Sequence, residues 1–251
     1  MYVWDFLFYN MIVNYTDAGW QIIMQRTHGL LAAQICARWK ISNQPVRWMD
    51  TLVATAEHDD VYNEFEDEAL LNENGGPVNF KMSRFRQDYC ERQLQRAISK
   101  SRYITLLMAK HIRFVFGKEP AAMDFLKALK SKEKLWLSEA DTTEKEIDAS
   151  YALLEFCDAF SLLICQNLVQ PEGRKIEISN GPDQKTYMLS ALADDCITVQ
   201  DWPFETDAFT VWYECRTLNQ LSFNSTAEFK KALDLAKVEL ISLSIQKSHG
   251  K

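Results

Sequence analysis

Three histidines and one isolated carboxylate are the residues of this sequence best suited to chemistry at a metal ion. His28, His58 and His111 fall on the inward faces of expected helices or at a helix end, and His249 lies in the C-terminal tail. Asp158 stands in the middle of an otherwise apolar helical stripe. Because a buried ionised carboxylate is costly unless it is paired or bound to a metal ion, we expect Asp158 to lie beside the histidines.

The types of these side chains indicate the kind of metal chemistry they suit. Imidazole and carboxylate ligands from several helices are typical of a divalent cation that activates water for hydrolysis. His58 and Asp59 are adjacent, and at a helix end both side chains can turn toward one ion. We therefore predict a divalent metal ion (Mn, Fe, Mg, Co or Ni) bound by His28, His58, Asp59, His111 and Asp158.

Each of these residues also has an ordinary structural interpretation. His58 and Asp59 fit an exposed helix C-terminus, where a protonated histidine interacts well with the helix dipole. His28 and His111 fit hydrogen-bonded histidines of a core, and Asp158 fits a buried pair with a basic side chain or a tyrosine hydroxyl. The metal interpretation is favoured because one ordered series of residues explains all five.

Helices that would position these residues follow from the spacing of apolar side chains. Helical spacing begins at Arg26, and Pro45 is expected at the start of a second helix that has Met49 inward and ends near residue 58. A capping box at Thr143–Glu146 begins a long helix that ends near residue 170. The other helices of this region are expected over residues 86–99, 101–116 and 120–138.

Strand-like segments lie at both ends of the chain. A hairpin is expected over residues 11–24, and a capping box at Ser225–Glu228 begins a last helix. Further strands are expected over residues 175–179, 185–189, 196–200, 208–218 and 241–245. We therefore predict a mainly α fold (α+β overall), in which a helical body over 11–172 carries a small β-rich C-terminal part over 173–251.

Composition limits the classes of partner. Of 251 residues, 28 are Lys or Arg and 35 are Asp or Glu, a net charge of −7, which disfavours binding to a nucleic acid polymer. Eight acidic residues fall within residues 57–73, beside the expected site, which favours a small, metal-bound substrate over a long polyanion. No apolar run reaches the roughly 18 residues of a membrane span, so no membrane partner is expected. The oligomeric state is not predicted.

Cysteine usage and the first residues indicate the compartment. The six cysteines form no CxxC pair and most lie in apolar stretches, which is typical of a reducing cytoplasm. The aromatic opening segment lacks the cationic start and the cleavage site of a signal peptide. Met11 is the more natural start, so residues 1–10 are expected to be a start-site extension.

The order of the ligand candidates resembles that of a known superfamily. A histidine (His28), a His-Asp pair (His58–Asp59) and a late aspartate (Asp158) resemble the pattern of the HD-domain metal phosphohydrolases, whose helical bundle places these side chains around a metal ion. Many of its members carry a further histidine where His111 lies. One departure is Asp60-Val61-Tyr62, where a glycine-containing step is usual.

A closer resemblance is to the bacterial domain-of-unknown-function family 3891, over nearly all of residues 11–245. The segments that carry it are 25–31, 56–60, 75–80, 106–111 and 156–161.

The activity implied by this pattern is hydrolysis of a nucleotide or another small phosphoester. Asp60 is the candidate for proton transfer and Lys110 for a further catalytic role, while Arg84 and Arg113 are candidates for binding the substrate phosphate. One alternative is a catalytically inert nucleotide-binding or sensing module on the same scaffold. A di-iron oxygenase is disfavoured because no glutamate lies three residues before His28, His58 or His111.

Overall fold

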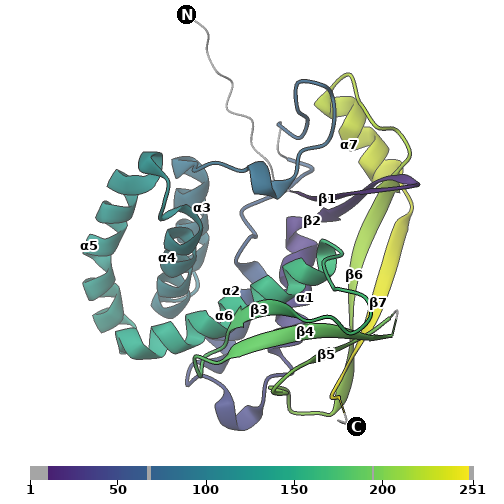
Figure 1. Ribbon diagram of the computed structural model, residues 1–251. Coiled ribbons are helices and arrows are strands. Elements are labelled where there is room, and N and C mark those ends of the chain that lie inside the picture. The colour runs from purple at the N-terminus through teal and green to yellow at the C-terminus, as the bar shows by residue number, and fades with distance from the viewer. Residues whose placement is uncertain (1–10, 67–68, 194, 249–251) are drawn as a thin grey trace, which may run out of the picture.

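A single seven-stranded sheet is the largest element of the computed structural model, which describes residues 11–66, 69–193 and 195–248 (Figure 1). Its order is β1-β2-β6-β7-β5-β4-β3, with β5 and β7 parallel and the other neighbours antiparallel. The strands are β1 (Met11–Thr16), β2 (Gly19–Met24), β3 (Ile176–Asn180), β4 (Thr186–Ala193), β5 (Cys196–Val199), β6 (Ala208–Leu218) and β7 (Val238–Gln246).

This sheet corrects the predicted fold class. The chain is 46% helical and 23% strand, and its sheet is mixed and curled into a half-barrel, so the fold is α/β and not a mainly α, HD-like bundle. The strands were expected, but their pairing was not: residues 20–22 of β2 pair with residues 216–218 of β6. A pairing between segments so far apart in the chain leaves no local pattern in the sequence. The sheet therefore contains strands from both sides of residue 172.

The helices lie within and beside this half-barrel. In Figure 1, α1 and α6 lie in the curl of the sheet, whereas α3, α4 and α5 form a separate layer on the side away from it. Among the described residues, no helix has both the length and the apolar character needed to cross a membrane. The helices are α1 (Gln25–Cys36), α2 (Trp48–Glu57), α3 (Gln87–Ile98), α4 (Arg102–Phe116), α5 (Met123–Glu139), α6 (Glu144–Cys165) and α7 (Thr226–Leu235), with short 3-10 turns at Ile41–Asn43, Phe80–Met82 and Pro120–Ala122.

Most helix limits lie close to the expected ones. The capping box at Thr143 and Glu146 is confirmed and begins α6. The expected start of α2 is wrong, because that helix begins at Trp48 and not at Pro45. Met49 was expected to face inward, but it is 64% exposed, because the buried stripe of α2 is Thr51, Ala54 and Thr55.

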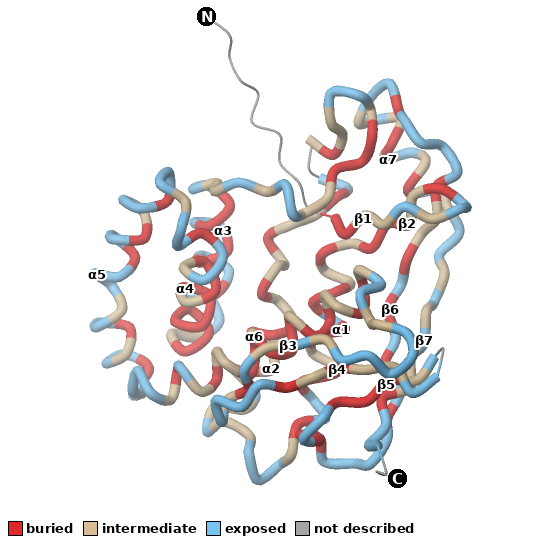
Figure 2. The backbone as a smooth tube through the Cα atoms, in the orientation of Figure 1, coloured by how far each residue is buried: buried red, intermediate tan, exposed pale blue. Residues whose placement is uncertain are grey.

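Two buried layers meet along α6 (Figure 2). One core fills the space between the sheet and α1 with α6, and it includes Phe156 and Phe204. The other lies between α2, α3, α4, α5 and the first half of α6. Because α6 contributes to both cores, its position is set from two sides.

Some residues named from the sequence lie outside the described residues. They are the expected start-site extension over 1–10, Asp67 and Glu68 of the acidic segment, and His249.

Two residues of α1, Gln34 and Gly29, position this helix in the opening of the half-barrel. β2 pairs only with the end of β6, and the Gln34 amide bonds to both the N–H and the carbonyl of Trp212, on the edge of β6 that β2 does not cover. On the opposite face, a Cβ at Gly29 would lie 2.7 Å from the carbonyl oxygen of Ala56 on α2. Glycine therefore permits the close approach of α1 to the last turn of α2.

A substitution at this contact tests how closely the two helices must pack. We expect Gly29→Ala to lower the free energy of unfolding by about 1–3 kcal/mol, because the added methyl group must push α1 away from α2. Leu30→Ala is the control, since Leu30 is 61% exposed on the same helix and its loss is expected to change stability by less than about 0.5 kcal/mol. Denaturant unfolding measures both, and equal stability of Gly29→Ala and wild type would contradict the close contact.

Candidate metal centre

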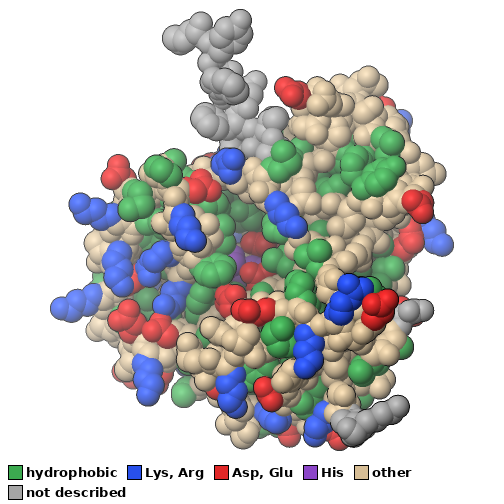
Figure 3. Space-filling model, in the orientation of Figure 1, with side chains coloured by type: hydrophobic (Ala, Val, Ile, Leu, Met, Phe, Trp, Pro, Cys, Tyr) green, Lys and Arg blue, Asp and Glu red, His purple; other side chains and the backbone are tan. Residues whose placement is uncertain are grey.

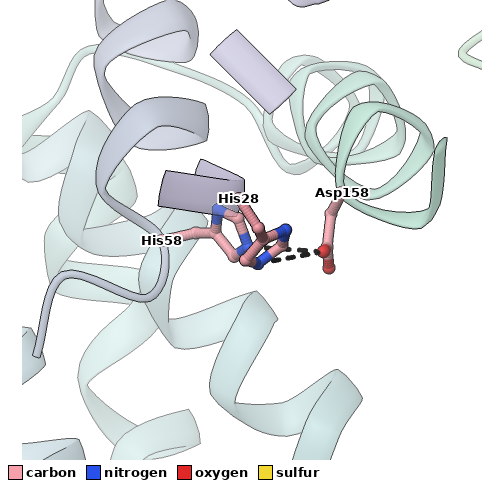
Figure 4. Close-up of side chains that lie close together, drawn as sticks. All are labelled: His28, His58 and Asp158. Atoms are coloured by element: carbon pink, nitrogen blue, oxygen red, sulfur yellow. Dashed lines mark ion pairs between the residues drawn. The ribbon is translucent and has the colours of Figure 1, made fainter. Parts of the chain in front are cut away.

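The five predicted ligands come from four helices that the structure brings to one point. His28 lies on the first turn of α1, and His58 and Asp59 directly follow α2. His111 lies on α4 and Asp158 on α6. Figure 4 shows His28, His58 and Asp158 with their polar atoms turned toward one another.

The first group of close atoms is formed by His28, His58 and Asp158, all buried. The Asp158 Oδ1 lies 3.3 Å from the Nε2 of His58 and 3.8 Å from the Nε2 of His28. The rings of the two histidines meet edge to face, with centroids 4.9 Å apart. One carboxylate oxygen therefore faces two imidazole nitrogens from different helices.

Asp59 connects this group to a second one. Its Oδ2 lies 3.1 Å from the Nε2 of His28 and 3.6 Å from the Nε2 of His58, and its Oδ1 lies 3.7 Å from the Nε2 of His111. Candidate ligand atoms of His58, Asp59 and His111 lie within 4.8 Å of one another. The two oxygens of Asp59 thus face different histidines.

Hydrogen bonds on the far side of the rings set the tautomers of two histidines. The Ser161 hydroxyl donates to the carbonyl of Asp158, so its oxygen accepts the hydrogen bond from the Nδ1 of His28 at 2.7 Å. The Nδ1 of His58 donates to the carbonyl oxygen of Thr55 at 2.9 Å. With Nδ1 protonated in both rings, a neutral imidazole presents the lone pair of its Nε2 to the cluster, which is the usual arrangement of metal-binding histidines.

Two polar atoms at the centre face each other without a third partner. The Nε2 of His58 and the Oδ1 of Asp158 are buried 3.3 Å apart, and no other described residue forms a hydrogen bond with either atom. Such atoms are costly in a protein interior. A metal ion about 2.1 Å from its ligands holds neighbouring ligand atoms about 3.0 to 3.4 Å apart, and the 3.3 Å separation here lies in that range. The residues present therefore fit a divalent cation.

The charges of the cluster also call for a cation. Burial alone would lower the pKa of His58, but the carboxylates of Asp59 and Asp158 outweigh it and raise that pKa from 6.5 to about 10. Burial alone would raise the pKa of both carboxyl groups, yet the His58 imidazole holds the pKa of each below its ordinary value. Two ionised carboxylates thus draw positive charge into a buried site, as a proton on His58 or as a bound metal ion.

The segment after α2 ties the cluster to the start of α1. The N-cap residue of α1 offers no side-chain bond, and a carboxylate oxygen of Glu64 accepts from the backbone N–H of Gln25 at 2.7 Å instead. The side-chain amide of Gln25 donates to the Oδ2 of Asp59 at 2.8 Å. The acidic segment that follows the His58–Asp59 pair therefore fixes the helix that carries His28.

The predicted catalytic and phosphate-binding residues are not brought into this cluster. The Asp60 carboxylate pairs with Arg26 at 3.6 Å and Arg96 at 3.9 Å. Lys110 pairs with Asp148 at 2.5 Å. Arg113 pairs with Glu133, and Arg84 is exposed in the segment before α3.

Lys110 and Arg113 line a small cavity of about 260 Å³ between α4, α5 and the start of α6. Helical geometry places both side chains away from His111, which faces the cluster. The roles proposed for these residues stay predictions.

Figure 3 shows a hollow in one face of the molecule, with histidine and acidic side chains visible at its floor. It lies between the layer of α3, α4 and α5 and the part of the molecule formed by β1, β2 and α1. The described histidines are His28, His58 and His111, all members of the cluster. The hollow therefore leads from solvent to the candidate metal centre.

Several residues of the site were not recognised as functional from the sequence. Ser161 and Gln25 hold His28 and Asp59, and the hydroxyl of Tyr151 lies 3.5 Å from the Nδ1 of His111. Glu155 lies one turn before Asp158 on α6 and is half-buried. For Tyr151, Glu155 and Ser161 the usable signal was a spacing of three to seven residues from Asp158, which places them near the same face of one helix.

Comparison with known proteins identifies the family. The sequence profile of a family described as "Protein of unknown function (DUF3891)" matches residues 11–220. The chain belongs to this family. Comparison of the chain with curated proteins and with solved structures found no match. The segment matched to DUF3891 includes the whole cluster from His28 to Asp158 and ends two residues after β6.

Removing one carboxylate tests whether this DUF3891 protein binds metal here. We expect Asp158→Asn to lose most of the bound transition metal, because the amide removes one of the two negative charges that attract it. Asp148→Asn is the matched control on α6, since the side chain of Asp148 is 53% exposed. Elemental analysis of both purified variants measures metal per chain, and full occupancy in Asp158→Asn would show that the carboxylate is not a ligand.

The hydrogen bond to His28 allows a subtler test. We expect Ser161→Ala to weaken metal binding by about 10-fold, because the Nδ1 of His28 loses the acceptor that orients the ring. Ser150→Ala is the control: this serine is also fully buried on α6, but it bonds to Tyr103 and not to a candidate ligand. Titration with Mn²⁺ or Co²⁺ gives the affinities, and equal losses in both variants would indicate a general effect on folding.

Proposed function

We propose that this protein is a metal-dependent hydrolase of small phosphoesters. The observation that carries the proposal is that oriented Nε2 atoms and two carboxylates converge on one point at the floor of a hollow. With Nδ1 protonated, the Nε2 of His58 and the Oδ1 of Asp158 are two buried acceptors that face each other. Two facing acceptors destabilise a site unless a proton or a metal ion lies between them.

The ligand set determines what the centre can do. A divalent cation in such a site would lower the pKa of a bound water to about 7 and would polarise a phosphoryl oxygen. His28, His58, Asp59, His111 and Asp158 are the residues that would hold it. Neutral imidazoles and hard carboxylate oxygens are better ligands for a hydrolytic divalent cation than thiolates are.

The phosphoester as substrate is supported by the order of the ligands. The series of a histidine, a His-Asp pair and a distant aspartate is similar to that of the HD-domain metal phosphohydrolases, although the fold differs. The acidic segment beside the site and the net charge of −7 favour a small substrate over a polymer. The cysteines that the structure describes are free, and we propose a reducing, cytoplasmic setting on that ground.

Metal-dependent turnover is the direct test. After removal of metal with a chelator, we expect no hydrolysis of p-nitrophenyl phosphate or of bis(p-nitrophenyl) phosphate, and recovery when Mn²⁺, Fe²⁺, Co²⁺ or Ni²⁺ is added. Asp59→Asn is expected to lose about 100-fold or more of the recovered rate, because Asp59 faces three of the histidines. Asp148→Asn serves as control. Metal-loaded wild-type protein without activity on any phosphoester would rule out the proposal.

A further inference from the structure

Glu155 is a titratable group at the site that the proposed ligand set does not use. It lies on α6, four residues after Tyr151 and three before Asp158. Both of those neighbours face the cluster, since Tyr151 approaches His111 and Asp158 approaches His58. Residues three and four apart lie on one side of a helix, so Glu155 extends the same face.

The surroundings of Glu155 differ from those of the ligand carboxylates. Burial raises the pKa of its carboxyl group, and the nearby Asp158 carboxylate raises it further. The Ser179 hydroxyl on β3 and the His111 imidazole on α4 act in the opposite direction, but they do not outweigh burial. The net effect is opposite to that at Asp59 and Asp158, where the pKa is lowered.

Carboxyl groups in such contrasting environments take different roles. Asp59 and Asp158 are held ionised at the centre, as a metal ligand must be. Glu155 is less buried than Asp158 and has no lysine or arginine among the groups that shift its pKa. A half-buried carboxyl group that lies beside a hydrolytic centre and has a raised pKa is suited to donate a proton.

We propose that Glu155 is the proton donor to the leaving-group oxygen during phosphoester hydrolysis. This inference rests on the proposed function. Asp60, the residue favoured for proton transfer by sequence, pairs with two arginines, whereas Glu155 shares the helix face of Asp158.

The step balances without another reactant. An oxygen of water forms a bond to phosphorus, and the bond between phosphorus and the leaving oxygen breaks with its electron pair on that oxygen. The carboxylic acid of Glu155 gives its proton to this oxygen, which leaves as an alcohol. The proton lost by the attacking water returns to the Glu155 carboxylate through solvent, so the net reaction consumes one water.

Leaving groups of different basicity provide the test. We expect Glu155→Gln to lower kcat for an alkyl phosphate by about 100-fold or more, because an alkoxide is a poor leaving group without a proton. For p-nitrophenyl phosphate the loss is expected to stay below about 3-fold, since nitrophenolate leaves unassisted. Glutamine keeps the size of the side chain, and Glu144→Gln, at a side chain 68% exposed on the same helix, is the control.

A measurement of metal content accompanies the rates. Wild-type protein and Glu155→Gln are expected to bind equal amounts of metal per chain. Equal losses on both esters, unchanged rates on both, or a loss of metal in Glu155→Gln would overturn the assignment to Glu155. A metal-loaded wild type that hydrolyses neither ester would instead overturn the proposed function, and the inference with it.

Discussion

Two carboxylates packed among three buried imidazoles impose the constraint on which the helical half of this protein depends. Asp59 and Asp158 lie within 4 Å of histidine nitrogens from α1, α2 and α4. Such a cluster is tolerable only when positive charge is supplied and every remaining polar atom is bonded. The bonds of His28 to Ser161 and of His58 to Thr55 meet the second condition, and they leave the Nε2 atoms of both rings for a cation.

The sheet matters to this cluster because it positions two of the four helices. β2 leads directly into α1, so His28 lies four residues beyond a strand, and α6 is covered by β3 on the side of Glu155. Gln34 holds α1 to the edge of β6 that β2 does not cover, and Gly29 lets the last turn of α2 approach α1. The half-barrel thus acts as a rigid frame, and the helical layer of α3, α4 and α5 closes the other side of the site.

Local patterns predicted most of the elements well, and they singled out five residues that the structure brings together, because both depend on short-range chemistry. The capping box at Thr143 and the apolar stripe around Asp158 are local features, and both agree with the structure. The fold class was wrong because it depends on pairings such as that of β2 with β6, which link residues nearly 200 positions apart and leave no periodic signal. Glu155 was missed for a related reason: its spacing from Asp158 places it on the same helix face, but its partial burial depends on the packing of distant elements.

Charge balance connects the candidate centre to the proposed chemistry. Lys110 and Arg113, the cations that the sequence places next to His111, point away from it and are neutralised by Asp148 and Glu133. A phosphoryl group that enters the hollow therefore approaches two carboxylates, and the cation that the cluster is built to hold must offset them. Negative charge develops on the leaving oxygen during hydrolysis. Neither Lys110 nor Arg113 of α4 lies close enough to the cluster to neutralise that charge. The Glu155 carboxyl group on the same face of α6, with its raised pKa, would resolve that difficulty, since a proton from it neutralises the leaving oxygen without adding another positive charge to the buried cluster.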